Sequence, residues 1–395
     1  MGKYDYQKPI IEKGKEILSK HNMLILALET RAGKSYVSLQ IVDTEKSVLI
    51  VTTKSALPDF KEVPEILGLN FKDITFINYE SLHKIKVHKY DYVIADEFHK
   101  ITAYPKPNIA RKRLEKFIGE NTKLIMLSGT PHVESKSQLF HALSLHPLHP
   151  FAEYKSFYLW FKDGFGVMNP DGTYRQKFVG YGRTKNDYDE TYNFEEYYKH
   201  FTITLTREEA GHEHHTPQLN RIYVDMPEHL MNIYKSMKSN SIASFMDYTF
   251  ISNNGASRLQ KLQQLSGGTC IDEYEIPRIL SDFKADFIKK KYENEDIVVL
   301  YKYKAEKQLL ESKGLKCIQF DSGTTGLDLS HIDRLVIMTC TFSGANFIQG
   351  ITRMCNANRD KEMPVDVILS KGTLDDEILK TVETKQNVNT AIFRK

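Results

Sequence analysis

The chain has 395 residues, which is enough for two or three domains of ordinary size. Its composition, 41% hydrophobic and 27% charged without any biased tract, is typical of a globular protein and excludes fibrous and low-complexity classes. The net charge is only +3, so the chain as a whole is not basic enough to indicate nucleic-acid binding. Any contact with nucleic acid must therefore come from local basic patches.

The expected compartment follows from three observations. The sequence has no run of about 18 apolar residues that would predict a membrane span. The N-terminus, MGKYDYQKPIIEKGKE, has no apolar signal core. The four cysteines are scattered without a CxxC pair and are typical of free thiols in a reducing compartment. We therefore expect a cytoplasmic protein without membrane contact.

The first 150 residues alternate between helical and strand patterns. Apolar residues at helical spacing predict a helix over residues 8–20. Continuous apolar runs, which are typical of strands buried on both faces, follow at 23–28, 47–53, 74–79, 91–96 and 123–130. This alternation predicts an α/β domain over residues 1–150, with a parallel sheet covered by helices.

The rest of the chain is predicted to contain three parts. Residues 151–215 are rich in Tyr, Phe, Gly, Asn and Asp without a strand rhythm, which indicates an inserted segment. The helical pattern of residues 228–266 predicts a helical connector over 216–280. Short apolar strands then return and predict a second, small α/β domain over 281–395; they lie at 297–301, 315–320, 334–339 and 365–370.

The segment ETRAGKS, Glu29–Ser35, follows a predicted strand and precedes a helical stretch. Strand, tight loop and helix are the context that a phosphate-binding loop requires. Backbone N–H groups at the helix N-terminus would face the phosphates, and the loop residues concerned are Thr30, Arg31, Ala32 and Gly33. Lys34 would neutralise the β- and γ-phosphates, and Ser35 would bind Mg²⁺ through its hydroxyl. Leu28 stands where the full pattern has its first glycine, so the segment alone is also compatible with a solvated turn.

The segment DEFH, Asp96–His99, ends the predicted strand DYVIAD. Its carboxylates would therefore lie at the carboxyl edge of the sheet, where ligands bind in open α/β folds. Asp96 would hold Mg²⁺, and Glu97 would orient and deprotonate the attacking water. An acidic surface loop is the alternative, but the buried strand and the upstream phosphate loop favour an ATPase site.

The order of these motifs resembles that of the superfamily-two helicases and translocases, and is most similar to Swi/Snf-type ATPases and their compact phage relatives. Tyr6–Gln7 resembles the family's adenine-reading glutamine motif, whereas ETRAGKS and DEFH resemble motifs I and II. LSGTP at 127–131 resembles motif III, which couples the ATP state to strand position. The resemblance implies two RecA-like lobes with the ATP cleft between them. It also implies a coupling role for His99, Ser128 and Thr130.

Two further stretches resemble the motifs that contact a nucleic-acid strand. VTTKSAL at 51–57 is similar to motif Ia, and INYESL at 77–82 is similar to the stretch that follows it. The resemblance implies that seven side chains contact nucleic acid, namely Thr52, Thr53, Lys54, Tyr79, Ser81, Thr324 and Thr325.

The second lobe carries the remaining resemblance. GLDLS at 326–330 resembles motif V, which implies a nucleotide contact for Asp328. QGITR resembles motif VI, which implies that Gln349 contacts the γ-phosphate or water and that Arg353 is an arginine finger. Asn356 stands where motif VI usually has a second arginine. Either Arg359 takes that place or the finger is single.

The stretch Lys100–Lys116 carries six basic side chains. It is interpreted either as a patch that tracks phosphates beside the ATPase site or as a solvated helix face. The sequence leaves both interpretations open.

The sequence as a whole predicts a monomeric, ATP- and Mg²⁺-dependent DNA helicase or translocase. Such a protein would couple hydrolysis to movement on, or remodelling of, double-stranded or branched DNA by unwinding, annealing or branch migration. The alternatives are an ATP-dependent nucleic-acid clamp that unwinds little, which Asn356 would favour, and an RNA helicase. A different P-loop enzyme such as a kinase is disfavoured, because it would need neither SGTP nor a second lobe.

Overall fold

The computed structural model divides the chain into two compact units. Unit 1 comprises Met1–Phe178 and Thr184–Glu213, and unit 2 comprises Val179–Arg183 and His214–Lys395. The residues that the structure describes are 6–29, 32–129, 136–173, 175–178, 184–186, 194–205, 209, 218–320, 332–344, 347, 350–351 and 364–392. Over these ranges no helix is both long enough and apolar enough to cross a membrane.

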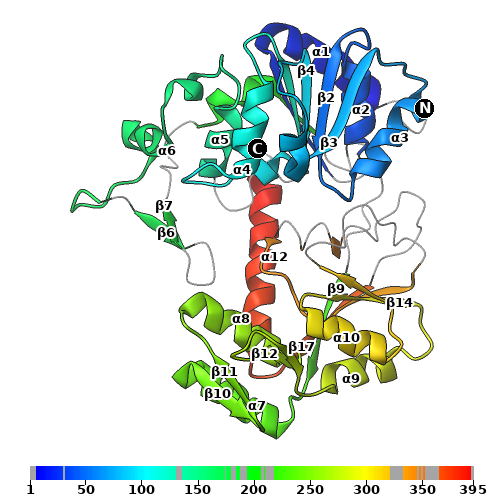
Figure 1. The fold of residues 1–395 in the computed structure, drawn as a ribbon, viewed down its shortest axis with the longest axis vertical. Helices are drawn as coiled ribbons and strands as arrows, with labels where there is room; N and C mark the ends of the chain where they lie inside the picture. Colours follow the sequence, from blue (N-terminus) through cyan, green and yellow to red (C-terminus); the bar gives the residue numbers. More distant parts are fainter. Residues whose placement is uncertain are drawn as a thin grey trace. The chain divides into compact units, whose positions relative to one another are not determined.

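Unit 1 is built on a six-stranded sheet in which every pairing is parallel (Figure 1). Its strands are β1 (Met23–Leu28), β2 (Ser47–Thr52), β3 (Asp73–Asn78), β4 (Tyr92–Asp96), β5 (Lys123–Leu127) and β8 (Thr202–Leu205). Their order is β3-β2-β4-β5-β1-β8. The central strands are buried along their whole length, as the continuous apolar runs predict.

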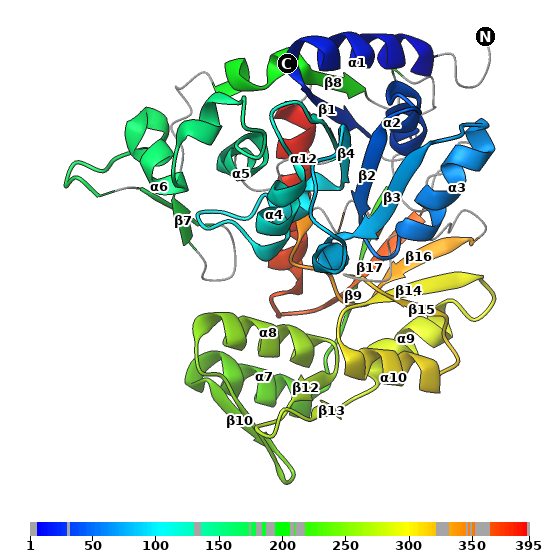
Figure 2. The same ribbon diagram turned by 45° about the horizontal axis from the view of Figure 1, so that its top comes forward.

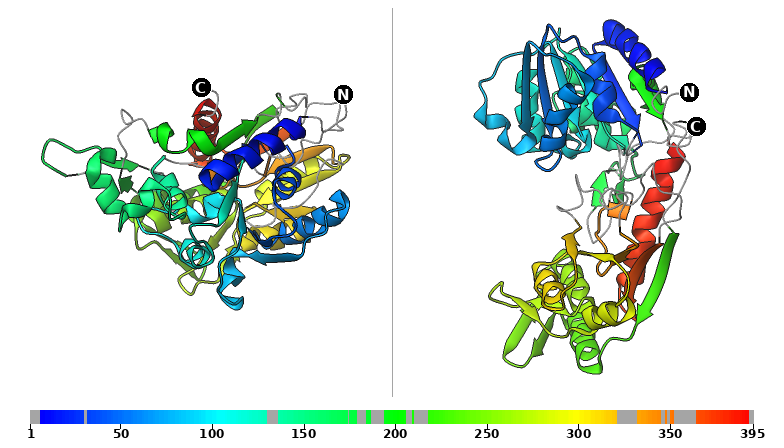
Figure 3. Two further views of the ribbon diagram at one scale, coloured as in Figure 1. Left: turned by 90° about the horizontal axis from the view of Figure 1, so that it is seen from above. Right: turned by 90° about the vertical axis from the view of Figure 1, so that its right-hand side faces the viewer.

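Helices cover both faces of this sheet. Helices α1 (Gln7–His21), α2 (Lys34–Ile41) and α3 (Leu57–Leu67) lie on one face, and α4 (Ile109–Leu114) and α5 (Leu139–Leu143) lie on the other (Figure 2). Short 3-10 turns follow β3 and β4, namely η1 (Tyr79–Lys84) and η2 (Phe98–Ile101). Two more adjoin helices, η3 (Glu115–Phe117) after α4 and η4 (Lys136–Gln138) before α5. Helices on both faces explain why these strands carry apolar side chains on both sides. Figure 3 gives two further views of this arrangement.

Most of the segment that was predicted to be an insertion is part of unit 1. It contains η5 (Pro150–Glu153), α6 (Phe157–Trp160), a π-turn η6 (Phe161–Phe165), the hairpin β6 (Gln176–Phe178) and β7 (Thr184–Asn186), η7 (Phe194–Tyr197) and η8 (Lys199–Phe201). Trp160 is fully buried, with its ring centroid 4.7 Å from that of Phe165 and 5.0 Å from that of Phe140. The aromatic composition therefore reflects a core rather than a separate subdomain.

Residues 151–215 carry no strand rhythm in the sequence, yet they contain a strand of the main sheet. Strand β8 lies in this segment and pairs with β1, with Ile203 opposite Leu26. It has only four residues at the edge of the sheet, and only Ile203 is buried. So short an edge strand leaves little hydrophobic pattern in the sequence.

Unit 2 is built on a five-stranded parallel sheet in the order β15-β14-β16-β17-β9. The strands are β9 (Gln218–Val224), β14 (Ile297–Tyr301), β15 (Cys317–Gln319), β16 (Arg334–Ile337) and β17 (Pro364–Ser370). The helices are α7 (Glu228–Asn240), α8 (Gly255–Ser266), α9 (Phe283–Lys291), α10 (Lys304–Ser312) and α12 (Asp375–Ile392). Alternate residues of β14 enter different cores: Val298 and Leu300 pack with α7, α8 and α12, whereas Val299 packs with α9 and α10. These two parallel sheets confirm the predicted α/β fold with two lobes.

The stretch 216–280 is not purely helical, in contrast to the prediction. It begins with β9, which pairs along its whole length with β17 in the sheet of unit 2. It also contains two hairpins, β10 (Ile242–Phe245) with β11 (Tyr248–Ile251) and β12 (Thr269–Ile271) with β13 (Pro277–Ile279). Strand β9 carries polar residues such as Asn220, which donates to the Asp366 carboxylate (2.8 Å). A search for apolar runs therefore does not find this strand.

We predict that replacing Phe157 in the aromatic segment destabilises unit 1. Phe157 is 1% exposed and its centroid lies 5.3 Å from that of Trp160, so Phe157→Ala should cost about 3–5 kcal/mol through the cavity it leaves. Trp160 is the only tryptophan of the chain, so urea unfolding followed by its fluorescence reports on this unit. The control is Leu159→Ala on the same helix, where Leu159 is 49% exposed. Equal unfolding midpoints for both variants would contradict an integral aromatic core.

Candidate ATPase site

Three neighbouring strands bring the predicted motifs to one edge of the sheet in unit 1. The strands β4, β5 and β1 are adjacent and parallel, with Asp96 opposite Leu127 in the register. Their carboxyl ends therefore lie side by side. The phosphate loop follows β1, DEFH begins at the end of β4, and Ser128 follows β5. This edge is where ligands bind in open α/β sheets.

The described part of the phosphate loop lies between β1 and α2, as its sequence predicts. Gly33 precedes α2 with a φ of 75°, in the left-handed region that favours glycine. Lys34 is the first residue of α2, and its Nζ donates to the carbonyl oxygens of Leu28 (2.9 Å) and Glu29 (3.3 Å). Ser35 follows in the first turn and is half-buried. These bonds hold the Lys34 ammonium group against the loop, although Leu28 replaces the usual glycine.

The glutamine motif lies against the same loop. The Gln7 side chain is buried, and its Nε2 donates to the Tyr6 hydroxyl (3.4 Å). A Cβ at Gly33 would lie 2.3 Å from Gln7 Nε2, so this side chain would have to shift to make room for it. The fold thus places Gln7 beside the loop from which it is separated in the sequence.

Asp96 is buried at the end of β4 and is held at two atoms. Thr52 Oγ1 donates to Asp96 Oδ2 (2.6 Å), and the Tyr79 hydroxyl donates to the Asp96 carbonyl oxygen (2.7 Å). Burial, together with the charge of Glu97, raises the pKa of Asp96 to about 6. The hydrogen bond from Thr52 and the positive charge of Lys34 act in the opposite direction. Motifs I and II thus lie at the same carboxyl edge of the sheet, and the positive charge of Lys34 acts on Asp96.

Glu97 and His99 form a pair directly after Asp96. Glu97 has a φ of 49°, an uncommon backbone conformation for this residue that costs on the order of 1–3 kcal/mol. His99 Nδ1 lies 3.2 Å from Glu97 Oε2, and both side chains are mostly buried. His99 was predicted to link the ATP site to Ser128 and Thr130. In the structure, the His99 ring contacts the carboxylate of Glu97, the predicted catalytic base.

Two of the residues that were predicted to contact nucleic acid point into the protein rather than toward its surface, and their contact with nucleic acid stays a prediction. The side chains of Thr52 and Tyr79 are buried and bonded to Asp96. Burial and the charges of Asp96 and Glu97 raise the pKa of the Tyr79 hydroxyl well above its usual value, so it remains a donor. Thr52 ends a strand that is buried on both faces, and in such a strand the sequence does not show which way a hydroxyl points. The inward hydrogen bonds of these two residues were missed for that reason.

The other predicted contacts of these two motifs lie nearer the surface. Lys54 is exposed, and Thr53 and Ser81 are half-buried. The Ser81 N–H donates to the Asn78 side chain (2.9 Å). Ser128 of motif III is fully buried, and its N–H donates to the Leu26 carbonyl oxygen (3.2 Å).

The basic stretch 100–116 does not form a uniform patch. Arg111 is buried and donates from Nε to the His141 carbonyl oxygen (3.1 Å) and from one Nη to that of Ser144 (3.1 Å). It therefore fastens α4 to α5. Arg113 donates to the Glu80 carbonyl oxygen of η1 (2.9 Å). The lysines of the stretch remain exposed, namely Lys100, Lys106, Lys112 and Lys116.

Several predicted site residues lie outside the described ranges. In unit 1 these are Thr30, Arg31 and Thr130. In unit 2 they include every predicted residue of motifs V and VI and their neighbours, namely Thr324, Thr325, Asp328, Gln349, Arg353, Asn356 and Arg359. Their assignments therefore stay predictions.

The oxygen donors of the site suit a magnesium ion. Mg²⁺ prefers one or two carboxylates or hydroxyls together with phosphate oxygens. Ser35 and Asp96 supply this donor set beside Lys34. Over the described parts of the chain, no group of three or more His, Cys, Asp or Glu side chains is arranged to hold a metal ion.

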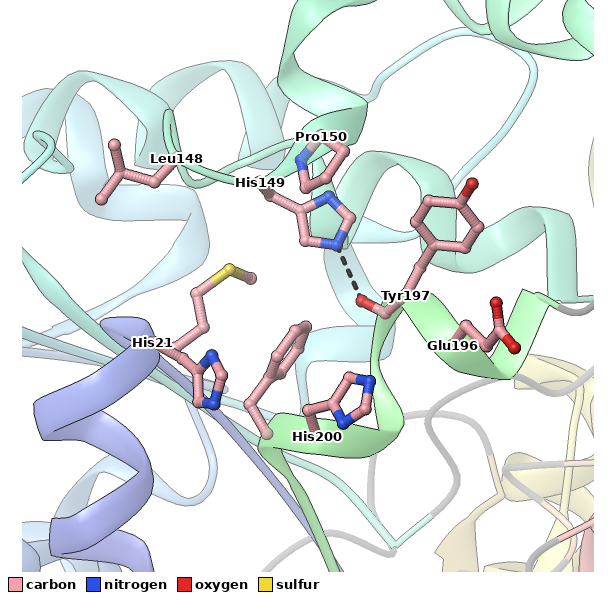
Figure 4. Close-up of a pocket in the computed structure, with 9 residues that line it drawn as sticks. His21, Leu148, His149, Pro150, Glu196, Tyr197 and His200 are labelled. Atoms are coloured by element: carbon pink, nitrogen blue, oxygen red, sulfur yellow. Dashed lines mark hydrogen bonds between the residues drawn. The ribbon is translucent and has the colours of Figure 1, made fainter.

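A separate cavity of about 350 Å³ lies at the opposite end of β1. Its lining includes Met23 at the start of β1, together with His149, Tyr197 and His200 (Figure 4). His149 Nε2 is bonded to the Tyr197 carbonyl oxygen (2.9 Å), and burial lowers the pKa of His149 to about 4. Because Met23 begins β1 and the phosphate loop follows its end, this cavity is not part of the candidate ATPase site.

Comparison with known proteins agrees with this geometry. A model of the SNF2-related domain matches residues 14–272. No curated protein matches the chain. Two solved structures of a Sulfolobus solfataricus SWI2/SNF2 ATPase are similar at 14% identity over 98% of this chain. The ATPase core in complex with dsDNA has a TM-score of 0.43 with 92% of that chain covered, and the core domain alone has a TM-score of 0.42 with 89% covered.

Each of the two α/β units is built on a parallel sheet, and unit 1 has the phosphate-loop sequence after β1 and an acidic pair at the end of β4, as in a helicase-like protein of superfamily two. The family match extends over more than half of the sequence. The chain therefore belongs to the SNF2-related domain family. At the level of this family, membership implies ATP hydrolysis linked to nucleic acid.

We predict opposite effects of pH on two aspartates at the two ends of β4. Because the pKa of Asp96 is raised to about 6, the folded chain keeps a proton between about pH 4 and pH 6 that the unfolded chain releases. The stability from Asp96 is therefore full below about pH 4 and is lost as the pH rises through 6. Asp96→Asn should be more stable than the parent at pH 7, on the order of 2 kcal/mol, and equal to it at acidic pH.

The matched control is Asp91→Asn, at the other end of the strand. Hydrogen bonds from the Ser47 backbone and side chain lower the pKa of Asp91, so its stabilisation is present at neutral pH and is lost as the pH falls. Asp91→Asn should therefore be less stable than the parent at pH 7. Urea midpoints in Mg²⁺-free buffer from pH 4 to 8 check both signs. A loss of stability in Asp96→Asn at pH 7 would contradict the raised pKa.

Proposed function

We propose that this protein is an ATP-driven motor that moves along or remodels double-stranded DNA. The observation that carries the proposal is that Lys34 and the Asp96–Glu97 pair lie at the same edge of one sheet. Membership in the SNF2-related domain family supports it. Duplex translocation is favoured over strand separation because the motifs are most similar to Swi/Snf-type ATPases.

Each residue at this edge has a chemical task in the proposal. Lys34 binds and neutralises the terminal phosphates of ATP. Ser35 and Asp96 would hold Mg²⁺, which would supply positive charge to the phosphates when bound with ATP. Glu97 accepts the proton of the attacking water, and His99 keeps the Glu97 carboxylate in position through the 3.2 Å contact. Gln7 and Tyr6 bind the adenine.

The other roles in the proposal rest on the family resemblance. Gln349, Arg353 and Asp328 complete the nucleotide site, with Arg353 stabilising the charge on the transferred phosphoryl group. Ser128 and Thr130 report the state of the nucleotide. Phosphates of the nucleic acid are contacted by Thr53, Lys54, Ser81, Thr324 and Thr325.

A second candidate function is an ATP-dependent clamp that binds DNA without moving along it. Asn356 favours this function, because motif VI usually has a second arginine there. A clamp would bind duplex DNA in an ATP-dependent way, and its ATPase would respond little to DNA.

We predict that Lys34→Ala and Glu97→Gln each lower the ATPase rate by about 100-fold or more while the fold is kept. Lys34→Ala removes a phosphate-binding charge, and Glu97→Gln removes the base but not its volume. Steady-state phosphate release measures the rate, and circular dichroism checks the fold. The control is Lys46→Ala, an exposed lysine in the loop before β2. Near-normal rates in both site variants would refute the mechanism.

We predict that duplex DNA stimulates the ATPase of the chain more than single-stranded DNA or RNA does. The chain should displace the third strand of a triplex, which reports translocation, but should separate a plain duplex poorly. These two displacement assays are run with ATP, and with Glu97→Gln as the inactive control. Strong stimulation by RNA alone would favour an RNA helicase, and an unstimulated ATPase with ATP-dependent DNA binding would favour the clamp.

A further inference from the structure

Asp96 is hydrogen-bonded to two residues, Thr52 at the end of the neighbouring strand β2 and Tyr79 just after β3. Thr52 Oγ1 donates to its carboxylate (2.6 Å) and the Tyr79 hydroxyl donates to its carbonyl oxygen (2.7 Å). Thr52 is 0%, Tyr79 4% and Asp96 7% exposed. Water cannot readily replace these bonds, and breaking one leaves a buried polar group without its partner. The end of β4 is therefore tightly tied to the ends of β2 and β3.

The hydrogen bond from Thr52 connects Asp96 directly to a surface segment. Thr52 is the last residue of β2, and the next two residues are Thr53 and Lys54. The Thr53 hydroxyl accepts the Ala56 N–H (3.3 Å), and the Thr53 carbonyl oxygen accepts the Leu57 N–H (3.1 Å) at the start of α3. The exposed Lys54 thus lies on a turn that is fixed between Thr52 and α3.

The hydrogen bond from Tyr79 connects Asp96 to another surface segment. Tyr79 is the first residue of η1, and the strand order β3-β2-β4 means that its side chain reaches past the end of β2 to Asp96. The Asn78 side chain caps η1 by accepting the Ser81 N–H (2.9 Å). Beyond Tyr79, η1 exposes His83 and Lys84. A movement of Tyr79 would therefore be passed to the whole short turn.

We propose that Thr52 and Tyr79 are positioning residues that couple the nucleotide state at Asp96 to the two surface segments 53–56 and 80–84, which bind the DNA backbone. The inference rests on the proposed function, because it concerns the same ATPase site. When Asp96 binds Mg²⁺ with ATP, any shift at the end of β4 is transmitted through the two hydroxyls. By thermodynamic linkage, DNA held by these segments biases the ATP site by the same factor.

The test measures coupling rather than catalysis. The affinity of a fluorescein-labelled DNA duplex is measured with and without adenylyl imidodiphosphate and Mg²⁺, and the ratio of the two dissociation constants is the coupling factor. Thr52→Val and Tyr79→Phe remove one hydroxyl each with little change in volume. We expect the coupling factor to fall at least threefold toward one in each variant. The affinity for duplex without nucleotide should stay within about twofold, because neither side chain reaches the surface.

Three control variants separate coupling from general damage. Thr52→Ser keeps the hydroxyl and should keep the coupling factor of the parent. Tyr90→Phe and Thr122→Val also remove buried hydroxyls, which donate to Thr75 Oγ1 (3.3 Å) and to the Tyr90 carbonyl oxygen (2.8 Å). Both lie before β4 and β5, at the opposite ends of these strands from Asp96. They should destabilise the fold without changing the coupling factor.

The possible outcomes are distinct. Parent-like coupling in both Thr52→Val and Tyr79→Phe would overturn the inference and leave the proposed motor function standing. Equal losses of coupling in all hydroxyl variants would also overturn it, because the effect would then reflect stability alone. A parent chain in which nucleotide does not change the affinity for duplex would refute both the inference and the proposed motor.

Discussion

The burial of a carboxylate at the end of β4 is the constraint on which the site depends. In water, Asp96 would be ionised and mobile, but here it is enclosed, and burial raises its pKa to about 6. The protein offsets this cost with a hydroxyl from β2, and it keeps the positive charge of Lys34 nearby. Such a carboxylate gains from a divalent cation, because the cation replaces the solvation that the fold has removed. The free protein is thus less stable at this position than it would be with an amide, which is the usual cost of a preorganised site.

The sequence predicts the parts of this structure that leave a strong local signal. Strands β1, β2, β4 and β5 are continuous apolar runs because helices cover both faces of their sheet. The phosphate loop is recognisable because it lies between such a strand and a helix. Strands β8 and β9 are not recognisable, because β8 is short and β9 carries polar residues such as Asn220 that bond within the sheet. Their pairing is decided by tertiary contacts that no local pattern encodes.

The site itself is predicted at the level of motifs, but not of side-chain directions. Lys34, Asp96 and Glu97 lie where the motif order indicates, because parallel strands bring their carboxyl ends together. The hydrogen bonds of Thr52 and Tyr79 to Asp96 could not be predicted, since a hydroxyl beside a surface motif can point either way. Arg111 shows the same limit, because a basic stretch gives no sign that one of its arginines is needed to fasten two helices. The residue type predicts which interactions a side chain can make, but only the fold determines which partner it contacts.

Gln7 and Gly33 lie so close together that residue 33 affects both the adenine-binding and the phosphate-binding parts of the proposed site. A methyl group at residue 33 would force the Gln7 amide to move, and it would also oppose the positive φ. In the proposed site, a substitution at residue 33 would therefore change adenine binding and phosphate binding together. A mutational path toward another nucleotide base would have to begin at Tyr6 or Gln7 and leave residue 33 unchanged.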